Sequence, residues 1–408
     1  MPAEITASAK KQPIRGVGLL YLDFVITGVV MTLLGPLLPM LSARWMLNDA
    51  QAGYLFTAQF AASIGGMLLS SVLVGRFGYR ITVLLSLAVM AVGVGALARA
   101  DWTFGIISVC IFGLGFGINT PAVNLRIART NPHKAASALN LLNSCWGVGA
   151  MACPLLVASV QRSHHTPQFL YGTGIALIAL AAYISAVRFT EDGRATVAKN
   201  VEVTQSNIQN TIWNSRLLPA VAGLFFIYVG TENSVGGWVA SYARRIDAHA
   251  LWAITPSFFW GALLLGRFSA PLALRHIRET RLATAGVALA AVGILTLIAA
   301  KGMPVIMIGA AITGLGLSSV FPISVSLLTS WFGDVAPRIS GLIFSCGNFG
   351  GAVLPWAVGA LSTHFGSLRV GFTVPLVGAL SMVVFYLSHG EFSIVDEPLA
   401  PSSPTSEP

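Results

Sequence analysis

The stretch GLGFGINTP at residues 113–121 returns as GLGLSSVFP at residues 314–322, a shift of 201 residues. At the same shift, NSCWGVGAMACP (143–154) returns as FSCGNFGGAVLP (344–355), with no gap between the two matches. Over residues 113–158 and 314–359, 11 of 46 positions are identical, and glycine and proline are among them. The chain therefore contains an internal repeat of two halves that run in the same orientation.

The composition restricts the class of protein. Of the 408 residues, 55% are hydrophobic and only 10% are charged, whereas an ordinary soluble domain has about 25% charged residues. Mean hydropathy is +0.76, and the 42 glycines are scattered through apolar runs, which is typical of packed transmembrane helices. These values exclude a disordered, a nucleic-acid-binding or an ordinary cytosolic protein. The four cysteines have no metal-ligand spacing and the histidines fall in expected loops or helix ends, so we expect no metal and no cofactor.

Apolar segments of about 20 residues are long enough to cross a membrane. The chain has roughly twelve of them, and the first is too long for the apolar core of a signal peptide. The expected spans are residues 17–41, 51–74, 80–99, 102–128, 135–160, 168–188, 215–243, 250–274, 281–300, 303–329, 337–362 and 368–388. We therefore predict an all-α membrane protein with 12 transmembrane helices in two pseudo-symmetric six-helix bundles.

The expected spans and the repeat divide the chain into five parts. We expect a cytoplasmic N-terminal tail, an N-terminal six-helix bundle, a cytoplasmic linker, a C-terminal six-helix bundle and a disordered cytoplasmic tail. Their bounds are 1–16, 17–188, 189–214, 215–389 and 390–408. An even number of spans puts both termini on one side, and 16 of the 24 Lys and Arg residues lie on that side. The positive-inside rule therefore places both termini in the cytoplasm and explains the net charge of +9 without nucleic acid.

The loop between the second and third expected spans carries a known pattern. SVLVGRFGYR (71–80) resembles the G-x-x-x-D-R-x-G-R-R motif of the major facilitator superfamily. Arg76, Gly78 and Arg80 match the motif, whereas Ser71 and Gly75 depart from it. The resemblance extends over nearly the whole chain and implies a secondary transporter that works by alternating access of two helical halves.

Two further segments resemble the fucose:proton symporter-like family and its glucose/galactose relatives. GLGFGINTPAVN with LNLLNSCWGVG (113–124 and 139–149) is similar to the family's fourth and fifth helices. FFIYVGTENSVGGWVASY (225–242) is similar to its seventh. This resemblance implies a sugar as the solute. Family members carry an acidic residue within helix 1 or helix 4, whereas helix 4 here holds Ile118 and Asn119 at the corresponding place.

Glu232 is the most informative charged residue, because it lies near the middle of an expected span and Met31 occupies its repeat position. An ionised carboxylate is costly there unless a cation lies close. We interpret Glu232 as the proton-coupling group, with Tyr228 one turn away as a solute-binding residue that can hydrogen-bond it. Two alternatives stay open: a protonated Glu232 bonded to a neighbouring helix, and an ionised Glu232 paired with Arg267, either as a structural pair or as a switch.

Other polar side chains in the spans are candidates for solute contact. Asn119 and Asn143 align with apolar residues in the other half, and an amide both donates and accepts hydrogen bonds, as sugar hydroxyls require. Trp146 is a candidate platform for stacking against a sugar ring. Gln59 and Asn348 complete the set. For the asparagines, the alternative is that they hydrogen-bond one another and hold the helices together.

Four residues are candidates for gating. Asp23 lies about two turns into the first span and Arg126 near the same end of the fourth, so we predict an inner salt bridge between them. For Asp23, ion coupling and simple placement at the membrane interface are alternatives. Arg267 is a possible partner of Glu232, and Trp238 is either an interfacial anchor or part of the outer gate.

We therefore predict a symporter in the bacterial inner membrane, embedded in lipid, that carries a small polar solute, with a sugar favoured. Protons are the favoured coupling ion and Na⁺ is the alternative; we expect a monomer. A drug or metabolite exporter is the second interpretation, and a transporter-like nutrient sensor is a candidate from another class. The sequence contains no constellation of a membrane enzyme and no phosphate-binding loop that would couple transport to ATP.

Overall fold

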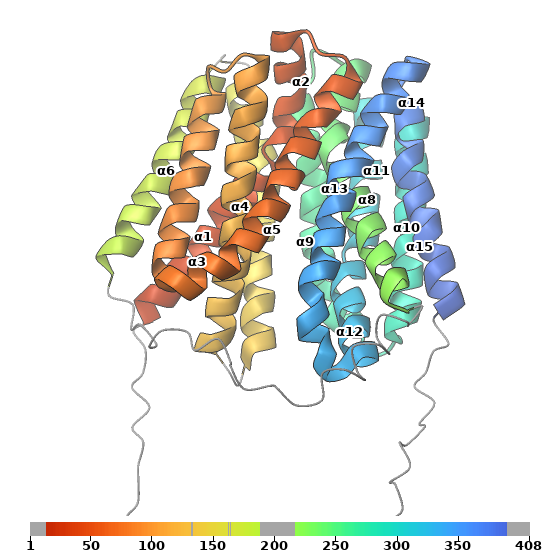
Figure 1. Cartoon of the computed structure of the whole chain (residues 1–408). Helices are drawn as coiled ribbons and strands as arrows, with labels where there is room; N and C mark the ends of the chain where they lie inside the picture. The colour runs from red at the N-terminus through yellow and green to blue at the C-terminus, as the bar shows by residue number, and fades with distance from the viewer. Residues whose placement is uncertain (1–13, 132–133, 162, 164, 188–216, 390–408) are drawn as a thin grey trace, which may run out of the picture.

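The computed structural model describes residues 14–131, 134–161, 163, 165–187 and 217–389. Within these residues every regular element is a helix (Figure 1). The N-terminal half contains α1 (Ile14–Thr32), α2 (Leu34–Trp45), α3 (Asp49–Leu97), α4 (Trp102–Thr130), α5 (Ala135–Gln161) and α6 (Thr166–Ala186). The expected linker 189–214 and C-terminal tail 390–408 lie outside the described residues, as does all but the last part of the N-terminal tail 1–16.

The C-terminal half is also helical. It contains α8 (Leu217–Ile246), η2 (Trp252–Ile254), α9 (Thr255–Ala273), α10 (Glu279–Ala299), α11 (Met303–Leu317), α12 (Val320–Phe332), η3 (Gly333–Val335), α13 (Ala336–Phe365), α14 (Leu368–Gly371) and α15 (Thr373–His389). Figure 1 shows the two halves side by side, with the described ends of the chain at the same end of the molecule.

Ten of the described helices or helix pairs are long and apolar enough to cross a membrane. The sequence predicts twelve. One difference is α3, which covers both expected spans 51–74 and 80–99; the other is α9, which is outside the ten. Within α3, Gly78 has a φ of +79°, a conformation that favours glycine, and the helix is kinked there. Gly66 before the kink and Gly93 after it both lie against the backbone of α4, so the chain folds back at Gly78.

Three expected spans are interrupted. The first breaks at Leu33 between α1 and α2, the tenth breaks at Ser318 and Ser319 between α11 and α12, and the twelfth breaks at Phe372 between α14 and α15. A proline clashes with the carbonyl group four residues earlier and lacks the N–H that would bond it. Each break lies where a proline disrupts the helix, because Pro36, Pro322 and Pro375 stand four residues after Thr32, Ser318 and Gly371.

Glycines at equivalent repeat positions make the same contact in each half. A Cβ atom on Gly149 of α5 would lie 1.9 Å from the carbonyl oxygen of Val25 on α1. A Cβ atom on Gly350 of α13 would lie 1.9 Å from the carbonyl oxygen of Phe226 on α8. Both residues of the second pair are shifted by 201 from those of the first. The predicted pseudo-symmetry of the two halves is therefore present in their helix packing.

The halves meet along three helix pairs: α3 with α13, α5 with α9, and α2 with α8. In the last pair, a Cβ atom on Gly35 would lie 2.7 Å from the carbonyl oxygen of Gly236. These two glycines are also related by the repeat. The backbones of α2 and α8 therefore touch at equivalent positions.

We predict that Gly149→Ala destabilises the N-terminal half, because the new methyl group would overlap the Val25 carbonyl. Overpacking of this kind costs about 1–3 kcal/mol, so the thermal unfolding midpoint of the purified protein should fall. Gly172→Ala in α6 is the matched control, since a Cβ atom there meets nothing within 4 Å. Equal midpoints for the two variants would contradict the assigned packing of α1 against α5.

Candidate functional site

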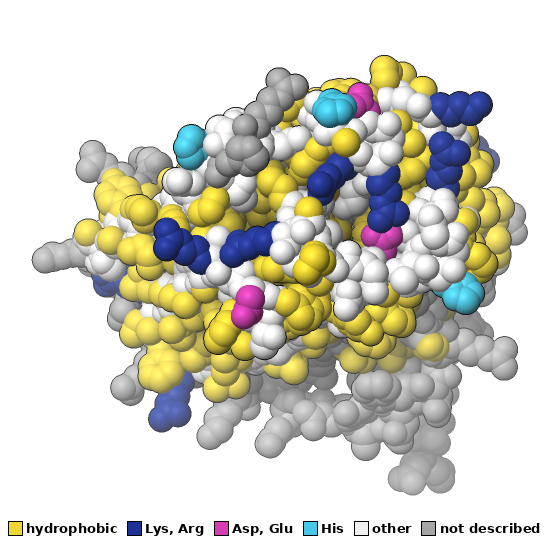
Figure 2. Space-filling view, turned by 90° about the horizontal axis from the view of Figure 1, so that it is seen from above, with side chains coloured by type: hydrophobic (Ala, Val, Ile, Leu, Met, Phe, Trp, Pro, Cys, Tyr) yellow, Lys and Arg dark blue, Asp and Glu magenta, His cyan; other side chains and the backbone are white. Residues whose placement is uncertain are grey.

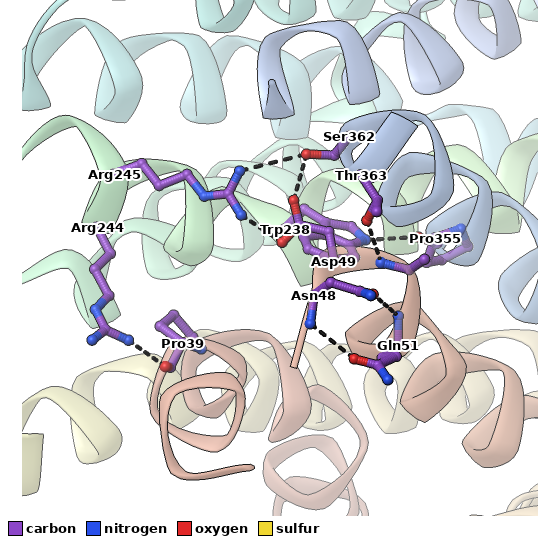
Figure 3. A network of polar contacts seen from close by, with 11 residues as sticks. Pro39, Asn48, Asp49, Gln51, Trp238, Arg244, Arg245, Pro355, Ser362 and Thr363 are labelled. Atoms are coloured by element: carbon purple, nitrogen blue, oxygen red, sulfur yellow. Dashed lines mark hydrogen bonds and ion pairs between the residues drawn. The ribbon is translucent and has the colours of Figure 1, made fainter. Parts of the chain in front are cut away.

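A polar network joins the halves at the end of the molecule opposite the described chain ends. Asp49 is the first residue of α3, and Asn48 and Gln51 fix that helix start with a capping box. The carboxylate of Asp49 accepts a hydrogen bond from Ser362 of α13 through one oxygen (Figure 3). Its other oxygen lies 2.5 Å from Nη2 of Arg245 on α8. Asp49 and Arg245 form the ion pair that is found within the described part of the chain.

Backbone groups strengthen this closure. The Ala50 N–H donates to Oγ1 of Thr363 at 2.8 Å, and Arg244 donates to the carbonyl oxygen of Pro39. Trp238, only 1% exposed, donates from Nε1 to the carbonyl oxygen of Pro355 at 2.8 Å. Trp238 therefore lies at this closed end, and its role as a gate stays a prediction. Seen from this end, charged side chains stand among polar and apolar ones (Figure 2).

The recorded contacts between the halves run from this network to the middle of the molecule. One polar contact between α3 and α13 lies nearer the chain ends than the others found in the described residues. It joins Nδ2 of Asn348 to Sδ of Met67 at 3.4 Å. Asn348 also donates to the carbonyl oxygen of Phe344 in its own helix, at 3.0 Å. Its amide oxygen is left available as an acceptor.

Two tryptophans meet across the interface near its middle. Trp146 of α5 and Trp260 of α9 pack edge to face, with ring centroids 5.6 Å apart and an interplanar angle of 86°. The indole N–H of Trp260 is buried and has no hydrogen-bond partner among the described residues. Trp146 also packs against the cluster formed by Met31 and Phe60. Trp260 is only 3% exposed, so in this structure the pair is largely buried and contains one unused donor.

The side-chain amide of Gln59 bonds to another residue of the protein in this structure, not to the space where a solute would bind. It is 1% exposed, and its Nε2 donates to the carbonyl oxygen of Met31 at 2.9 Å and to the Met31 sulfur at 3.0 Å. Asn143 differs, because its side chain is exposed and its Nδ2 donates to the carbonyl oxygen of Leu139 at 2.9 Å. Of these two candidate solute contacts, Asn143 is the accessible one.

Glu232, Tyr228 and Arg267 form a polar group at the interface of α8 and α9. Glu232 and Tyr228 are 6% and 2% exposed. Arg267 interacts electrostatically with both, and the Tyr228 hydroxyl approaches both charged groups without good hydrogen-bond geometry. No ion pair between Glu232 and Arg267 is found in the described ranges. The three residues lie close enough to interact, but the two charges are not in direct contact, and their roles in coupling and gating stay predictions.

A second polar group lies inside the N-terminal half. Asp23 and Asn119 are 0% exposed. Nδ2 of Asn119 donates to both carboxylate oxygens of Asp23, at 3.1 and 3.0 Å, and contacts Thr27 at 3.1 Å. Thr27 donates to Asp23 at 3.1 Å, and Ser86 donates to the Asn119 oxygen at 2.8 Å. These contacts join α1, α3 and α4.

The buried network changes the interpretation of two predicted residues. Asn119 does not reach the interface between the halves in this structure, because its amide is used inside one half. Arg126, seven residues farther along α4, lies over the ring of Tyr79, 5.9 Å from its centroid. An Asp23–Arg126 ion pair is absent from the described residues. Both the solute contact by Asn119 and the inner salt bridge stay predictions for other conformations.

Sequence reasoning missed Asp49, Arg245 and Trp260. Asp49 and Arg245 are charged residues at expected span ends, which is the normal place for charges, so nothing in the sequence distinguishes them. Trp260 is one aromatic residue among many. The described residues contain no group of three or more His, Cys, Asp or Glu side chains that could hold a metal ion, and the four cysteines are free.

The model of the Major Facilitator Superfamily matches residues 20–255 and 245–407. The chain belongs to the Major Facilitator Superfamily. It is a membrane transport protein by family and not an enzyme. It is 26% identical over 387 residues to the glucose/galactose transporter of Brucella abortus biovar 1 (strain 9-941), covering 90% of this chain and 92% of that protein.

Two further comparisons agree with this superfamily. The chain is 22% identical over 350 residues to the glucose/mannose transporter GlcP of Bacillus subtilis (strain 168), covering 83% of this chain and 86% of that protein. A crystal structure of the E. coli fucose:proton symporter, determined on a point variant, matches with a TM-score of 0.63 and 17% identity, covering 93% of this chain and 99% of that one. The predicted fold of a sugar transporter of this superfamily is confirmed.

Within this superfamily fold, we predict that Asn119→Leu destabilises the protein, because it leaves the buried Asp23 carboxyl without its amide donor. The cost of an unpaired buried polar group is about 1–3 kcal/mol, measured as a lower thermal unfolding midpoint. The double variant Asp23→Leu/Asn119→Leu removes both partners and should lose less than the two single variants together. Additive losses would contradict a direct Asp23–Asn119 interaction.

We predict that Asp49→Asn loosens the closed end of this transporter, because the ion pair with Arg245 is lost. An exposed ion pair contributes up to about 1 kcal/mol, or roughly fivefold in an equilibrium. In a variant whose only cysteine replaces Ala352, maleimide alkylation should accelerate by up to this factor. Asp101→Asn, at the start of α4 on the same end, keeps its helix cap and is the control. Equal alkylation rates would show that the pair does not hold the end closed.

Proposed function

We propose that this chain is a proton-coupled symporter that carries a sugar across the bacterial inner membrane by alternating access, with both termini in the cytoplasm. The observation that carries the proposal is the polar group Glu232, Tyr228 and Arg267. It lies at the interface of α8 and α9 in a molecule whose halves are joined at the far end. The named activities of the glucose/galactose and glucose/mannose relatives favour a sugar.

The closed network supports an alternating-access cycle. Asp49 and Arg245 belong to different halves, so their ion pair must break if that end opens. The excess of Lys and Arg in the segments on the side of the chain ends puts that side in the cytoplasm. In this proposal the closed end is the periplasmic one, which makes the conformation inward-facing. Rocking of the two halves about the central site would expose it alternately to each side.

The middle of the interface supports recognition of a sugar. Sugars have apolar ring faces and hydroxyl edges, so a site for them needs aromatic surface together with donors and acceptors. Trp146 and Trp260 supply the aromatic surface, and the Trp260 N–H and the Tyr228 hydroxyl are unused polar groups among the described residues. Asn143 supplies an accessible amide, and the oxygen of Asn348 is a further acceptor.

The position of Glu232 supports proton coupling. It is buried in the middle of α8, and no ion pair holds its carboxylate among the residues described. A carboxyl group in such a place is stabilised when it takes a proton, and it can release the proton when the site opens to water. Each cycle of opening therefore allows one proton to be exchanged at Glu232. The protein acts as a monomer in this proposal, because one chain supplies both halves of the site.

We predict that Glu232→Gln abolishes accumulation of sugar driven by a pH gradient in proteoliposomes, because the amide cannot release a proton. Exchange of labelled for unlabelled sugar should persist, since it needs solute binding but no net proton movement. Glu279→Gln, at the exposed start of α10, is the matched control and should accumulate sugar normally. Undiminished accumulation by Glu232→Gln would assign the coupling to another group, and dependence on Na⁺ would replace the proton.

A further inference from the structure

Arg267 has an unusual environment for a charged residue in a membrane-spanning helix. Its Nε is buried without a hydrogen-bond partner and its guanidinium makes no ion pair among the described residues, while the Tyr228 hydroxyl approaches it without good hydrogen-bond geometry. A guanidinium has five N–H donors, and leaving a cation unpaired in this position is costly. An arginine in this environment indicates that a ligand supplies the missing hydrogen-bond acceptors.

The register of the helices shows what faces Arg267 from α8. A Cβ atom on Gly236 would lie 2.6 Å from the ring of Trp260, so these residues are level on the antiparallel helices α8 and α9. Two turns farther toward the chain ends, Tyr228 comes level with Arg267. Glu232 lies one turn higher. The two charges therefore lie on neighbouring helices at depths that differ by about one turn.

The other half faces Arg267 through α5. A Cβ atom on Gly147 would lie 2.7 Å from Leu264, and one on Gly261 would lie 3.2 Å from Met151, so α5 and α9 also run antiparallel. One turn along each helix, Asn143 of α5 comes level with Arg267 of α9. The guanidinium therefore belongs to the boundary between the halves, where Asn143 is accessible.

We propose that Arg267 binds a carboxylate of the solute, so that the transported sugar is an acidic one, such as a hexuronate. This inference rests on the proposed function. A planar guanidinium matches a carboxylate through two parallel N–H···O bonds, and the Tyr228 hydroxyl is placed to donate a third. Nε of Arg267 and the Tyr228 hydroxyl are the two donors of this group that have no hydrogen-bond partner among the described residues. A neutral hexose would leave the positive charge without a counter-ion whenever Glu232 carries a proton.

The charges of the site then explain why proton and solute move together. While Glu232 is ionised, it balances Arg267 and repels an anion. When Glu232 takes a proton, Arg267 is left unbalanced and attracts the carboxylate. Each therefore favours binding of the other, as linkage requires. One proton and one anion cross together, so the net charge moved is zero.

Few other titratable groups lie around Glu232. The elements packed against α8 carry Arg44, Arg267, Arg338, Cys346, His364, Tyr386 and His389. Of these, all but Arg267, Cys346 and Tyr386 stand at or near helix ends. Within the described residues, the groups that act electrostatically on Glu232 are Arg267 and Tyr228. The pH dependence of solute binding is therefore assigned to Glu232.

The test compares D-glucuronate with D-glucose, which share the pyranose ring and differ at the carboxylate. The full-length purified protein is titrated with each sugar at neutral and at mildly acidic pH, and affinity is taken from the shift in its unfolding midpoint. We expect glucuronate to bind and to bind more tightly at acidic pH. Arg267→Gln should weaken glucuronate binding about tenfold or more, as for the loss of a charged hydrogen bond. Arg275→Gln, in the exposed turn after α9, is the matched control.

A second variant tests the coupling. Glu232→Gln should keep glucuronate binding and lose its pH dependence. Glucose binding without glucuronate binding, and unaffected by Arg267→Gln, would overturn the inference and leave the proposed sugar transport standing. If neither sugar binds, both proposals fail. If a variant does not fold, the comparison of glucuronate with glucose on the unmodified protein still shows whether the solute needs a carboxylate.

Discussion

Close contact between helix backbones is the constraint on which the rest of this structure depends. In a membrane, helices gain little from the hydrophobic effect when they associate, so they rely on close packing and on hydrogen bonds. Gly149 against Val25 and Gly350 against Phe226 let the same pair of helices pack in each half. With the helices so close, a buried polar side chain is either hydrogen-bonded within the bundle or left without a partner among the described residues.

The two buried carboxyl groups represent these two solutions. Asp23 has its partners inside one half, where Asn119 and Thr27 bond it and Ser86 orients the amide. Glu232 lies between α8 and α9, with an arginine close by that forms no ion pair with it among the described residues. The first arrangement holds α1, α3 and α4 together. In the second, no ion pair holds the carboxylate among the described residues, and the proposed proton coupling depends on this feature.

The sequence predicted the architecture well, because the architecture follows from repeating patterns. Apolar length located the spans, and the shift of 201 residues located the two halves and the glycines that pack them. The breaks before Leu34, Val320 and Thr373 were missed, although a proline, Pro36, Pro322 or Pro375, follows two residues after each of these helix starts. Proline does not always break a helix: Pro121 lies inside α4 without interrupting it. Neighbouring helices decide which of these prolines is accommodated.

The site was harder to predict, because its contacts are long-range. Asp49 and Arg245 are 196 residues apart, and Asn119 and Asp23 are 96 apart. Both asparagines, Asn119 and Asn143, had the same sequence signal, an amide in one half opposite an apolar residue in the other. The structure buries the first and exposes the second. A one-dimensional pattern gives depth along a helix but not the direction in which the side chain points.

The contact between Gly35 and Gly236 has a consequence for the symmetry of the interface. Residues related by the repeat can touch each other only near the axis that relates the halves. In a homodimer, this is an isologous contact, in which a residue meets its own copy. Gly35 meets the backbone of Gly236, whereas Gly236 itself faces the ring of Trp260, so the contact joins equivalent positions without being fully reciprocal.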